Sequence, residues 1–206
     1  MKGKSTKKFL LPQIAAASAL NEFELLRKLI LKAKSEKIPF TKIYECLLQN
    51  YLFTGYPTAL LSLKILKECY PKMKLPKKGD MNLYHFRKVG EVNCKKVYGN
   101  KYEKLIQNIS EFSPELSEWL VLEGYGKVFG RPGLTFKERE LCIVAVLSVM
   151  KFEDQLYSHI NGAVKSEASV DEIETVIINL DLPGKRKYSG LGLRVLNRYK
   201  KNRGMT

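Results

Sequence analysis

The chain lacks long hydrophobic runs: no apolar stretch reaches the roughly 18 residues that a membrane-spanning helix needs. It also has little of the period-two alternation of apolar and polar residues that is typical of half-buried strands. Apolar residues instead recur three and four positions apart, in a composition of 45% hydrophobic and 28% charged residues. That composition is ordinary for a globular protein. We therefore predict an all-α fold that does not associate with a membrane.

The first twenty residues have a weak likeness to a secretory signal peptide, since they combine lysines, a short apolar run and small side chains. Pro12 and Gln13 interrupt the apolar run. We therefore interpret this segment as part of the folded chain and expect a cytoplasmic protein.

Cysteine pairs of the C-x-x-C type are also missing. The four cysteines are Cys46, Cys69, Cys94 and Cys142, and none lies near another cysteine and a histidine in a metal-binding spacing. This excludes the usual zinc and dithiol sites, so we expect no bound metal. In a cytoplasmic protein we expect reduced thiols, with Cys46 and Cys142 in helix cores.

Acidic residues are absent from both ends of a chain whose net charge is +15. Residues 1–8 hold four lysines, and residues 185–203 hold eight lysines and arginines. A third basic stretch, residues 70–104, connects the two halves. This charge does not form a recognisable nucleic-acid-binding motif. We therefore interpret it as solvated tails and a connecting segment, and expect no nucleic-acid partner. Salt-sensitive, non-specific binding to polyanions is the alternative.

The helices are predicted from apolar spacing, with Asn21 as a cap inside the first of them. Residues 71–99 have no clean period, and we expect there a long connection with one or two short helices. We interpret residues 124–133 as a glycine-rich link, residues 55–57 as a turn and Pro183-Gly184 as a helix end. Outside the stretch described next, helices are predicted over residues 13–34, 41–53, 58–69, 100–109, 113–123, 169–180 and 188–199.

The stretch from Gly130 to Ala168 predicts a helical hairpin. Thr135 and Glu138 have the spacing of a capping box at a helix start. The helix that follows is apolar on most of its surface, which is typical of a buried helix. Residues 151–154 interrupt the pattern, and a second helix begins there.

Three polar residues of this hairpin are candidates for a site. Glu140 and His159 lie at similar distances from the break, so antiparallel helices with a rise of about 1.5 Å per residue bring them level. Gln155 lies four residues before His159 and shares its helix face. We expect the three groups to converge between the helices. The alternative is a structural histidine, with the glutamate and the glutamine on the surface.

The chain also has the pattern of an internal duplication with an offset of 130 residues. Ala15 then meets Ala145 and Ser18 meets Ser148, and the helix pattern and loop lengths agree. We predict an N-terminal repeat at residues 1–70, a basic connecting segment at 71–112 and a C-terminal repeat at 113–206. The copies differ where chemistry is expected, because His159 meets Leu29. A site would therefore belong to the second copy.

The ordered motifs RPGL, REL, VAVL, QLYSHINGA and DEI resemble the carboxymuconolactone decarboxylase family of the alkyl hydroperoxidase D (AhpD)-like superfamily. The resemblance covers roughly residues 125–178. It implies an all-α fold of duplicated AhpD-like helical units, a homo-oligomer, and acid–base decarboxylation of a small carboxylated lactone or keto acid. It also implies that the reaction needs no cofactor.

The resemblance assigns roles to particular residues. His159 falls at the family's histidine and would move a proton, and Glu140 would orient it. Arg131 or Arg139 would hold a substrate carboxylate, with Gln155 as a further substrate contact. The alternative for Arg139 is a solvent-facing charge at the helix start.

Two departures from the family pattern alter these expectations. Many members have a glutamate at the position of Gln155, and a glutamine cannot act as a base. The aromatic-Gly-x-Pro turn is kept in the first copy, as YLFTGYP, but not in the second. We therefore expect a pocket that is altered or assembled from both copies.

The peroxidase relatives have a C-x-x-C pair where this chain has Phe152 and Gln155, so dithiol peroxidase chemistry is excluded. Three functions remain open. They are a cofactor-free decarboxylase or related enzyme, a non-catalytic oligomeric ligand-binding or structural protein of the same fold, and a polyanion binder.

Overall fold

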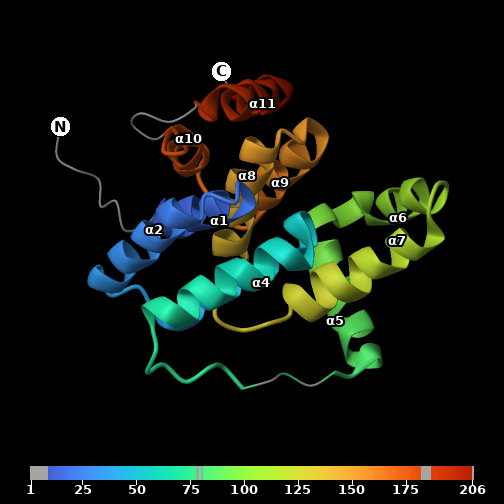
Figure 1. Cartoon of the computed structure of the whole chain (residues 1–206). Coiled ribbons are helices and arrows are strands. Elements are labelled where there is room, and N and C mark those ends of the chain that lie inside the picture. Colours follow the sequence, from blue (N-terminus) through green and yellow to red (C-terminus); the bar gives the residue numbers. More distant parts are fainter. Residues whose placement is uncertain (1–8, 78, 80, 182–186, 206) are drawn as a thin grey trace. The chain divides into compact units, whose positions relative to one another are not determined.

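The computed structural model describes residues 9–77, 79, 81–181 and 187–205. All regular secondary structure among these residues is helical (Figure 1). The prediction of an all-α fold is confirmed. Among these residues, no helix is both long and apolar enough to cross a membrane. The predicted basic arm and the helix end at Pro183-Gly184 fall largely outside the described residues.

The chain divides into two compact units. Unit 1 comprises Met1–Leu75 with Gly133–Thr206, and unit 2 comprises Pro76–Pro132. The sequence suggested divisions after residues 70 and 112 instead. The helices of unit 1 are α1 (Leu10–Ala19), α2 (Phe23–Ser35), α3 (Phe40–Gln49), α4 (Tyr51–Cys69), α8 (Phe136–Met150), α9 (Glu153–Lys165), α10 (Val170–Ile178) and α11 (Ser189–Asn202).

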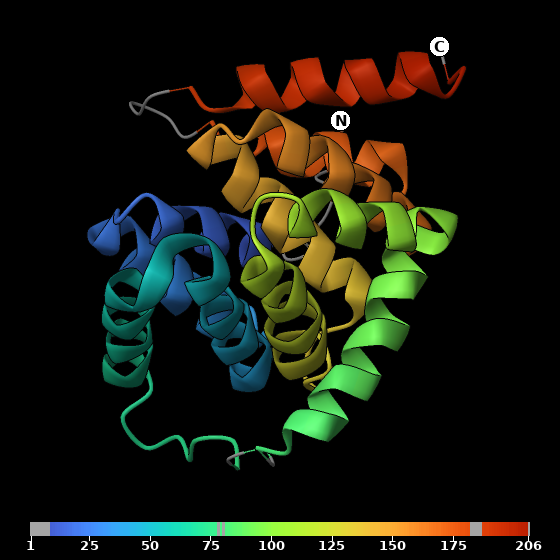
Figure 2. The same ribbon diagram turned by 90° about the vertical axis from the view of Figure 1, so that its right-hand side faces the viewer.

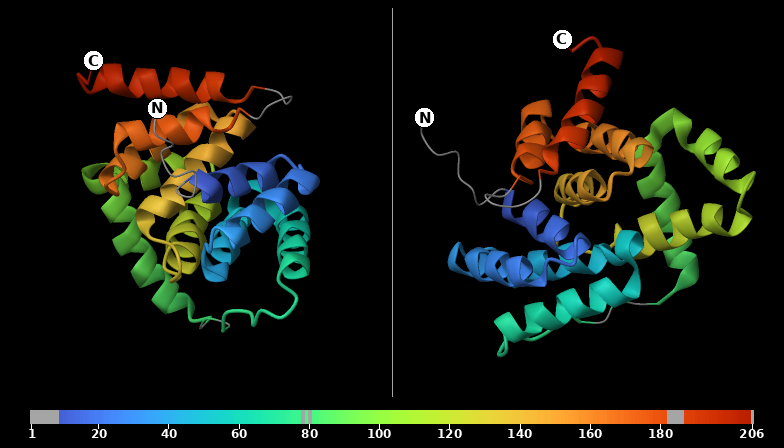
Figure 3. Two further views of the ribbon diagram at one scale, coloured as in Figure 1. Left: turned by 90° about the vertical axis from the view of Figure 1, so that its left-hand side faces the viewer. Right: turned by 45° about the horizontal axis from the view of Figure 1, so that its top comes forward.

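Helices α1 and α8 pack against each other in the middle of unit 1. Every residue of α8 from Arg139 to Val149 is buried, which confirms the prediction of a fully buried helix. Helix α11 lies across α9 and α10 (Figures 2 and 3). Most of α1 is buried as well, and Pro12 is tolerated there because it lies in the first turn.

The same backbone plan recurs in unit 1 with an offset of 130 residues. Helix α2 spans residues 23–35 and α9 spans 153–165, while α3 begins at residue 40 and α10 at 170. The non-glycine residues with positive φ recur too: Asn21 and Lys37 in the first half, Lys151 and Glu167 in the second. We call α1–α4 the first segment and α8–α11 the second segment.

The prediction of one helix over residues 13–34 is wrong, because the chain turns between α1 and α2. Asn21 was predicted as a helix cap, but its φ of 57° places it in the left-handed region, which asparagine tolerates better than most residues. Its side chain accepts a hydrogen bond of 2.9 Å from the Thr58 hydroxyl. The predicted break near residue 55 is present, since Gly55 has φ 74° inside α4.

Unit 2 is more helical than its sequence pattern suggested. Residues 71–99, predicted as a long connection, include the 16-residue helix α5. The link predicted at residues 124–133 is present only from residue 129, because Gly124 and Gly126 lie in a π-helix that ends at Val128. The elements are α5 (Leu83–Tyr98), the 3₁₀-helix η2 (Gly99–Lys101), α6 (Tyr102–Ser110), α7 (Pro114–Trp119) and the π-helix η3 (Leu120–Val128).

Glycines allow α5 and η3 to touch through their backbones. A Cβ on Gly90 would lie 2.1 Å from the Val121 carbonyl oxygen, and one on Gly126 would lie 2.1 Å from that of Phe86. No side chain fits at either position. Gly90 and Gly126 therefore serve close helix packing, whereas the sequence pattern had placed Gly126 in a glycine-rich link.

Candidate functional site

Helices α8 and α9 form the predicted hairpin. The capping box at the start of α8 is present: the Thr135 hydroxyl accepts from the Glu138 backbone, and the Glu138 carboxylate accepts from Thr135. Lys151 adopts φ 65° at the end of α8, and its N–H donates to the Leu147 carbonyl. The chain reverses over two residues, and α9 returns along α8 from Glu153.

This reversal brings Glu140 of α8 and His159 of α9 together. Nδ1 of His159 lies 2.8 Å from Oε2 of Glu140. The glutamate side chain is fully buried, and 13% of the histidine side chain is exposed. A buried carboxylate and a nearly buried imidazole therefore form a direct hydrogen bond, with the histidine on the more accessible side.

The hydrogen bond determines which ring nitrogen is available for chemistry. An ionised carboxylate can only accept, so Nδ1 donates to Glu140. In the neutral imidazole the other nitrogen, Nε2, then carries a lone pair and can take a proton. When the ring is protonated, the carboxylate stabilises its charge. The pair therefore suits a group that takes and gives one proton.

The carboxylate of Glu140 also has an unsatisfied oxygen. Its Oε1 is buried and has no hydrogen-bond partner among the residues described. A Cβ on Gly162 of α9 would lie 2.9 Å from this oxygen, so glycine makes room for the carboxylate. No sequence pattern indicates this requirement, because Gly162 lies inside a regular helix.

The first segment contributes a neighbour to His159. Phe53 of α4 lies edge-on to the imidazole, with ring centroids 6.1 Å apart and an interplanar angle of 78°. Phe53 belongs to the YLFTGYP stretch, which contains the aromatic-Gly-x-Pro turn of the first copy. Side chains from both segments therefore lie next to the histidine, and a pocket assembled from both copies stays a prediction.

Arg139 lies beside Glu140 in sequence but faces a different helix. Its side chain is fully buried, and it contacts Glu45 at 3.3 Å and Gln49 at 3.2 Å, both on α3. The alternative of a solvent-facing charge is therefore wrong. The guanidinium ties α8 to α3, and its role in binding a substrate stays a prediction.

The other two predicted contacts are not part of the Glu140–His159 pair. Gln155 is exposed on α9, so the expected convergence of three polar groups is wrong for this residue. Its position near the start of α9 leaves it in solvent, although it is four residues from His159. Arg131 belongs to unit 2, and its contribution to substrate binding stays a prediction.

The cysteines are buried and free. Cys46 and Cys142 are fully buried with sulfur atoms 3.7 Å apart, as the prediction of helix-core residues requires. The hydrogen bond from Cys46 and burial raise the pKa of Cys142 well above its ordinary value. In the part of the chain that the structure describes, no group of three or more histidine, cysteine, aspartate or glutamate side chains is arranged to hold a metal ion.

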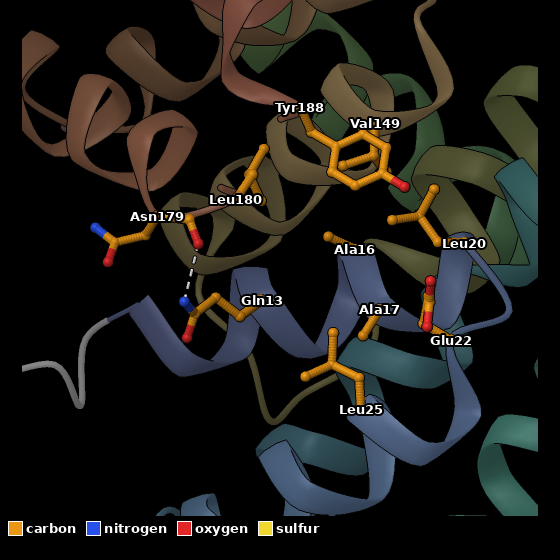
Figure 4. A pocket seen from close by; sticks show the side chains of 10 residues that line it. All are labelled: Gln13, Ala16, Ala17, Leu20, Glu22, Leu25, Val149, Asn179, Leu180 and Tyr188. Carbon is orange, nitrogen blue, oxygen red and sulfur yellow. Dashed lines mark hydrogen bonds between the residues drawn. The ribbon is translucent and has the colours of Figure 1, made fainter. Parts of the chain in front are cut away.

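A small cavity lies beside α1, where Gln13 Nε2 donates to the Asn179 carbonyl at 2.9 Å (Figure 4). Its volume is about 20 Å³, and Tyr188 and Val149 are among the residues that line it. This volume holds about one water molecule and no substrate. Neither Glu140 nor His159 lines this cavity.

The all-α fold is consistent with the AhpD-like type. The sequence profile of the carboxymuconolactone decarboxylase family matches residues 114–185. Over 96 residues, the chain is 28% identical to the 4-carboxymuconolactone decarboxylase of Acinetobacter baylyi, across 46% of this chain and 68% of that protein. The predicted resemblance to the family is confirmed, and the matched residues include both Glu140 and His159.

Proposed function

We propose that the protein is a carboxymuconolactone decarboxylase-like enzyme that removes carbon dioxide from a small carboxylated lactone or keto acid. The observation that carries this proposal is the hydrogen bond of 2.8 Å between Nδ1 of His159 and the buried Glu140 carboxylate. The similarity to a 4-carboxymuconolactone decarboxylase supports a substrate of this class.

The reaction consumes one proton per turnover. The carbon–carbon bond to the substrate carboxylate breaks, carbon dioxide leaves, and the electron pair stays on the substrate, delocalised towards its carbonyl. Nε2 of His159 takes a proton from water and donates it to the substrate carbon. Glu140 fixes the ring tautomer and stabilises the imidazolium. An adjacent carbonyl accepts the electron pair, so we propose that no cofactor takes part.

The repeated backbone plan supports the proposal that the chain arose by internal duplication, with one active copy. At the positions equivalent to Glu140 and His159, the first segment has Leu10 and Leu29, both buried. We also propose, from the family resemblance alone, a cytoplasmic homo-oligomer. Sedimentation of the purified protein measures whether its mass exceeds the 23.6 kDa of one chain.

The test is an assay of carboxymuconolactone consumption and carbon dioxide release. Wild type is compared with His159→Ala, and the matched control is His85→Ala, which changes the other histidine at an exposed position. We expect turnover by wild type and by the control, and a loss of about 10²–10⁴-fold with His159→Ala. Wild-type turnover by a folded His159→Ala protein would contradict the acid–base role.

The alternative is a non-catalytic, oligomeric ligand-binding or structural protein of the same fold. It is favoured by the exposed Gln155, which stands where many relatives have a glutamate that can act as a base. Calorimetry with the same lactone separates the alternatives. Binding without turnover by the wild type supports the ligand-binding function, whereas turnover excludes it.

A further inference from the structure

Unit 1 contains a second hollow, which we call the Lys42–Lys137 groove. Its volume is about 540 Å³, within the range of about 300–1,000 Å³ that is typical of small-molecule sites. Neither Glu140 nor His159 lines it, so it is separate from the acid–base pair. Its lining includes Leu11, Pro39, Lys42, Lys137, Glu138 and Leu141.

The floor of the groove is apolar. Leu11 of α1 and Leu141 of α8 are 7% and 8% exposed, and Ile38 lies between α2 and α3 with 7% exposed. Phe9 and the rings of Pro12 and Pro39 complete the apolar lining. A hydrocarbon chain placed here would lose contact with water over much of its surface, which favours binding.

The rim carries two lysines in ion pairs. Lys42 pairs with Glu138, and Lys137 pairs with Glu172 at 2.7 Å. Both lysine side chains are 34% exposed, so their ends reach solvent at the groove. Lys137 Nζ also donates to the Glu167 carbonyl at 3.0 Å. The rim therefore carries two paired, partly exposed ammonium groups above an apolar floor.

The two glutamates accept hydrogen bonds from the backbone as well as from the lysines. Each is the third residue of its helix in a capping box: Glu138 accepts from the backbone N–H of Thr135 at 3.0 Å, and Glu172 from that of Ser169 at 3.1 Å. These hydrogen bonds stabilise the carboxylates independently of the lysines. A ligand can therefore draw a lysine towards itself without leaving a glutamate unsatisfied.

Helix starts add positive potential on the same side. The groove is lined by residues from the first turns of α3, α8 and α10, where helix dipoles favour negative charge. The start of α3 has no side-chain cap, because its N-cap residue is Pro39. Glu138 and Glu172 balance the charges of the two lysines, so the preference for an anion comes from the helix starts. Together with the apolar floor, they favour a ligand with an apolar body and an anionic head.

We propose that the Lys42–Lys137 groove binds one small amphipathic carboxylate, of the size of a medium-chain fatty acid. The hydrocarbon chain lies on Leu11, Ile38 and Leu141, and the carboxylate accepts hydrogen bonds from Lys42 and Lys137. This site goes beyond the proposed decarboxylation, since it needs neither the histidine nor turnover.

The first experiment is calorimetric titration of the full chain with decanoate. Decanol and decyltrimethylammonium are matched probes that keep the hydrocarbon chain and change the head group. We expect one decanoate per chain, binding about tenfold or more weaker for decanol, and weaker still for the cation. Absence of saturable decanoate binding up to about 1 mM would overturn the proposal, as would equal affinities for the three probes.

Variants then locate the site. Pro39→Trp fills the groove at an exposed position, and we expect it to abolish decanoate binding. Lys42→Gln and Lys137→Gln should each weaken binding about tenfold, because a cation is lost while the glutamate stays. The matched control, Lys28→Gln, changes an exposed lysine of α2 outside the groove and should leave binding unchanged.

His159→Ala separates this proposal from the proposed function. Decanoate binding that persists in His159→Ala supports a separate site, whether or not the protein turns over a lactone. Binding that disappears with His159→Ala but survives Pro39→Trp would place the carboxylate at the histidine and overturn the groove assignment. Circular dichroism of each variant verifies that its helices are retained.

Discussion

The first and second segments of unit 1 share a backbone plan but differ in the residues at the centre of the hairpin. The second segment has Glu140 and His159, joined by a hydrogen bond of 2.8 Å, where the first has Leu10 and Leu29. Two apolar side chains therefore occupy the equivalent positions in the first segment. The shared backbone plan therefore does not depend on the Glu140–His159 pair, which agrees with the role in acid–base chemistry that we propose for it.

The largest expected effect comes from giving the second segment the residues of the first. The double substitution Glu140→Leu/His159→Leu should abolish decarboxylation while the protein keeps its fold. We expect stability to be unchanged or to rise by about 1–3 kcal/mol, because the variant removes a buried polar pair and the unsatisfied Oε1 of Glu140. Urea denaturation measures the stability, and a large loss would show that the pair is structural.

A large loss of stability is expected when the buried ion pair between the two segments is broken. Glu45→Gln removes the ion-pair partner of Arg139, whose side chain is fully buried. Removing one partner of a buried ion pair typically costs about 3 kcal/mol or more. The matched control is Glu24→Gln, which changes an exposed glutamate of α2 and should cost little. Equal midpoints of thermal unfolding for the two variants would contradict the role of this pair.

Gly162→Ala tests the space beside Glu140. The new Cβ would lie 2.9 Å from the carboxylate, so we expect a loss of about 1–2 kcal/mol, in spite of the higher helix propensity of alanine. The control is Gly190→Ala in α11, where nothing lies within 4 Å of the new atom, and this variant should gain stability. Equal gains for both would show that Gly162 is not tightly packed. Thermal unfolding measures both.

The smallest effect concerns the start of α11. Asp181 accepts hydrogen bonds from the backbone of Tyr188 at 2.6 Å and of Ser189 at 2.8 Å. Partial burial raises the pKa of Asp181, but the hydrogen bonds from Ser189 and Tyr188 outweigh it, and the pKa is lowered. This contribution is therefore present above the unfolded pKa of about 3.9 and is lost as the pH falls through the lowered folded value.

Asp181→Asn should accordingly reduce stability by about 1 kcal/mol at pH 7, as for the loss of a helix cap. Below the folded pKa of Asp181 the difference should disappear, because wild type has lost its carboxylate as well. Urea denaturation at neutral and acidic pH measures this. A difference that stays constant with pH would contradict the capping role.

Much of the second segment could be predicted from the sequence, because its signals are local. The capping boxes at Thr135 and Ser169 are present, and the spacing of Glu140 and His159 predicted their contact. The burial of Gln155 between the helices was predicted wrongly, because a residue at the helix start can share a helix face with His159 and still be exposed.

The remaining features depend on packing between segments distant in sequence. The partners of Arg139 lie about 90 residues away on α3, and no local pattern indicates them. Phe53 approaches His159 from α4, which only the tertiary fold determines. In unit 2, Gly126 was interpreted as part of a link, because the sequence alone does not distinguish a glycine required for close packing from one required for a turn.

The most direct test of the central claim is the release of labelled carbon dioxide from a ¹³C-carboxyl lactone. Wild type is compared with Glu140→Leu/His159→Leu under identical conditions. The account predicts release by wild type and only the uncatalysed rate with the folded double variant. Release at the wild-type rate by the double variant would contradict the assignment of acid–base chemistry to Glu140 and His159.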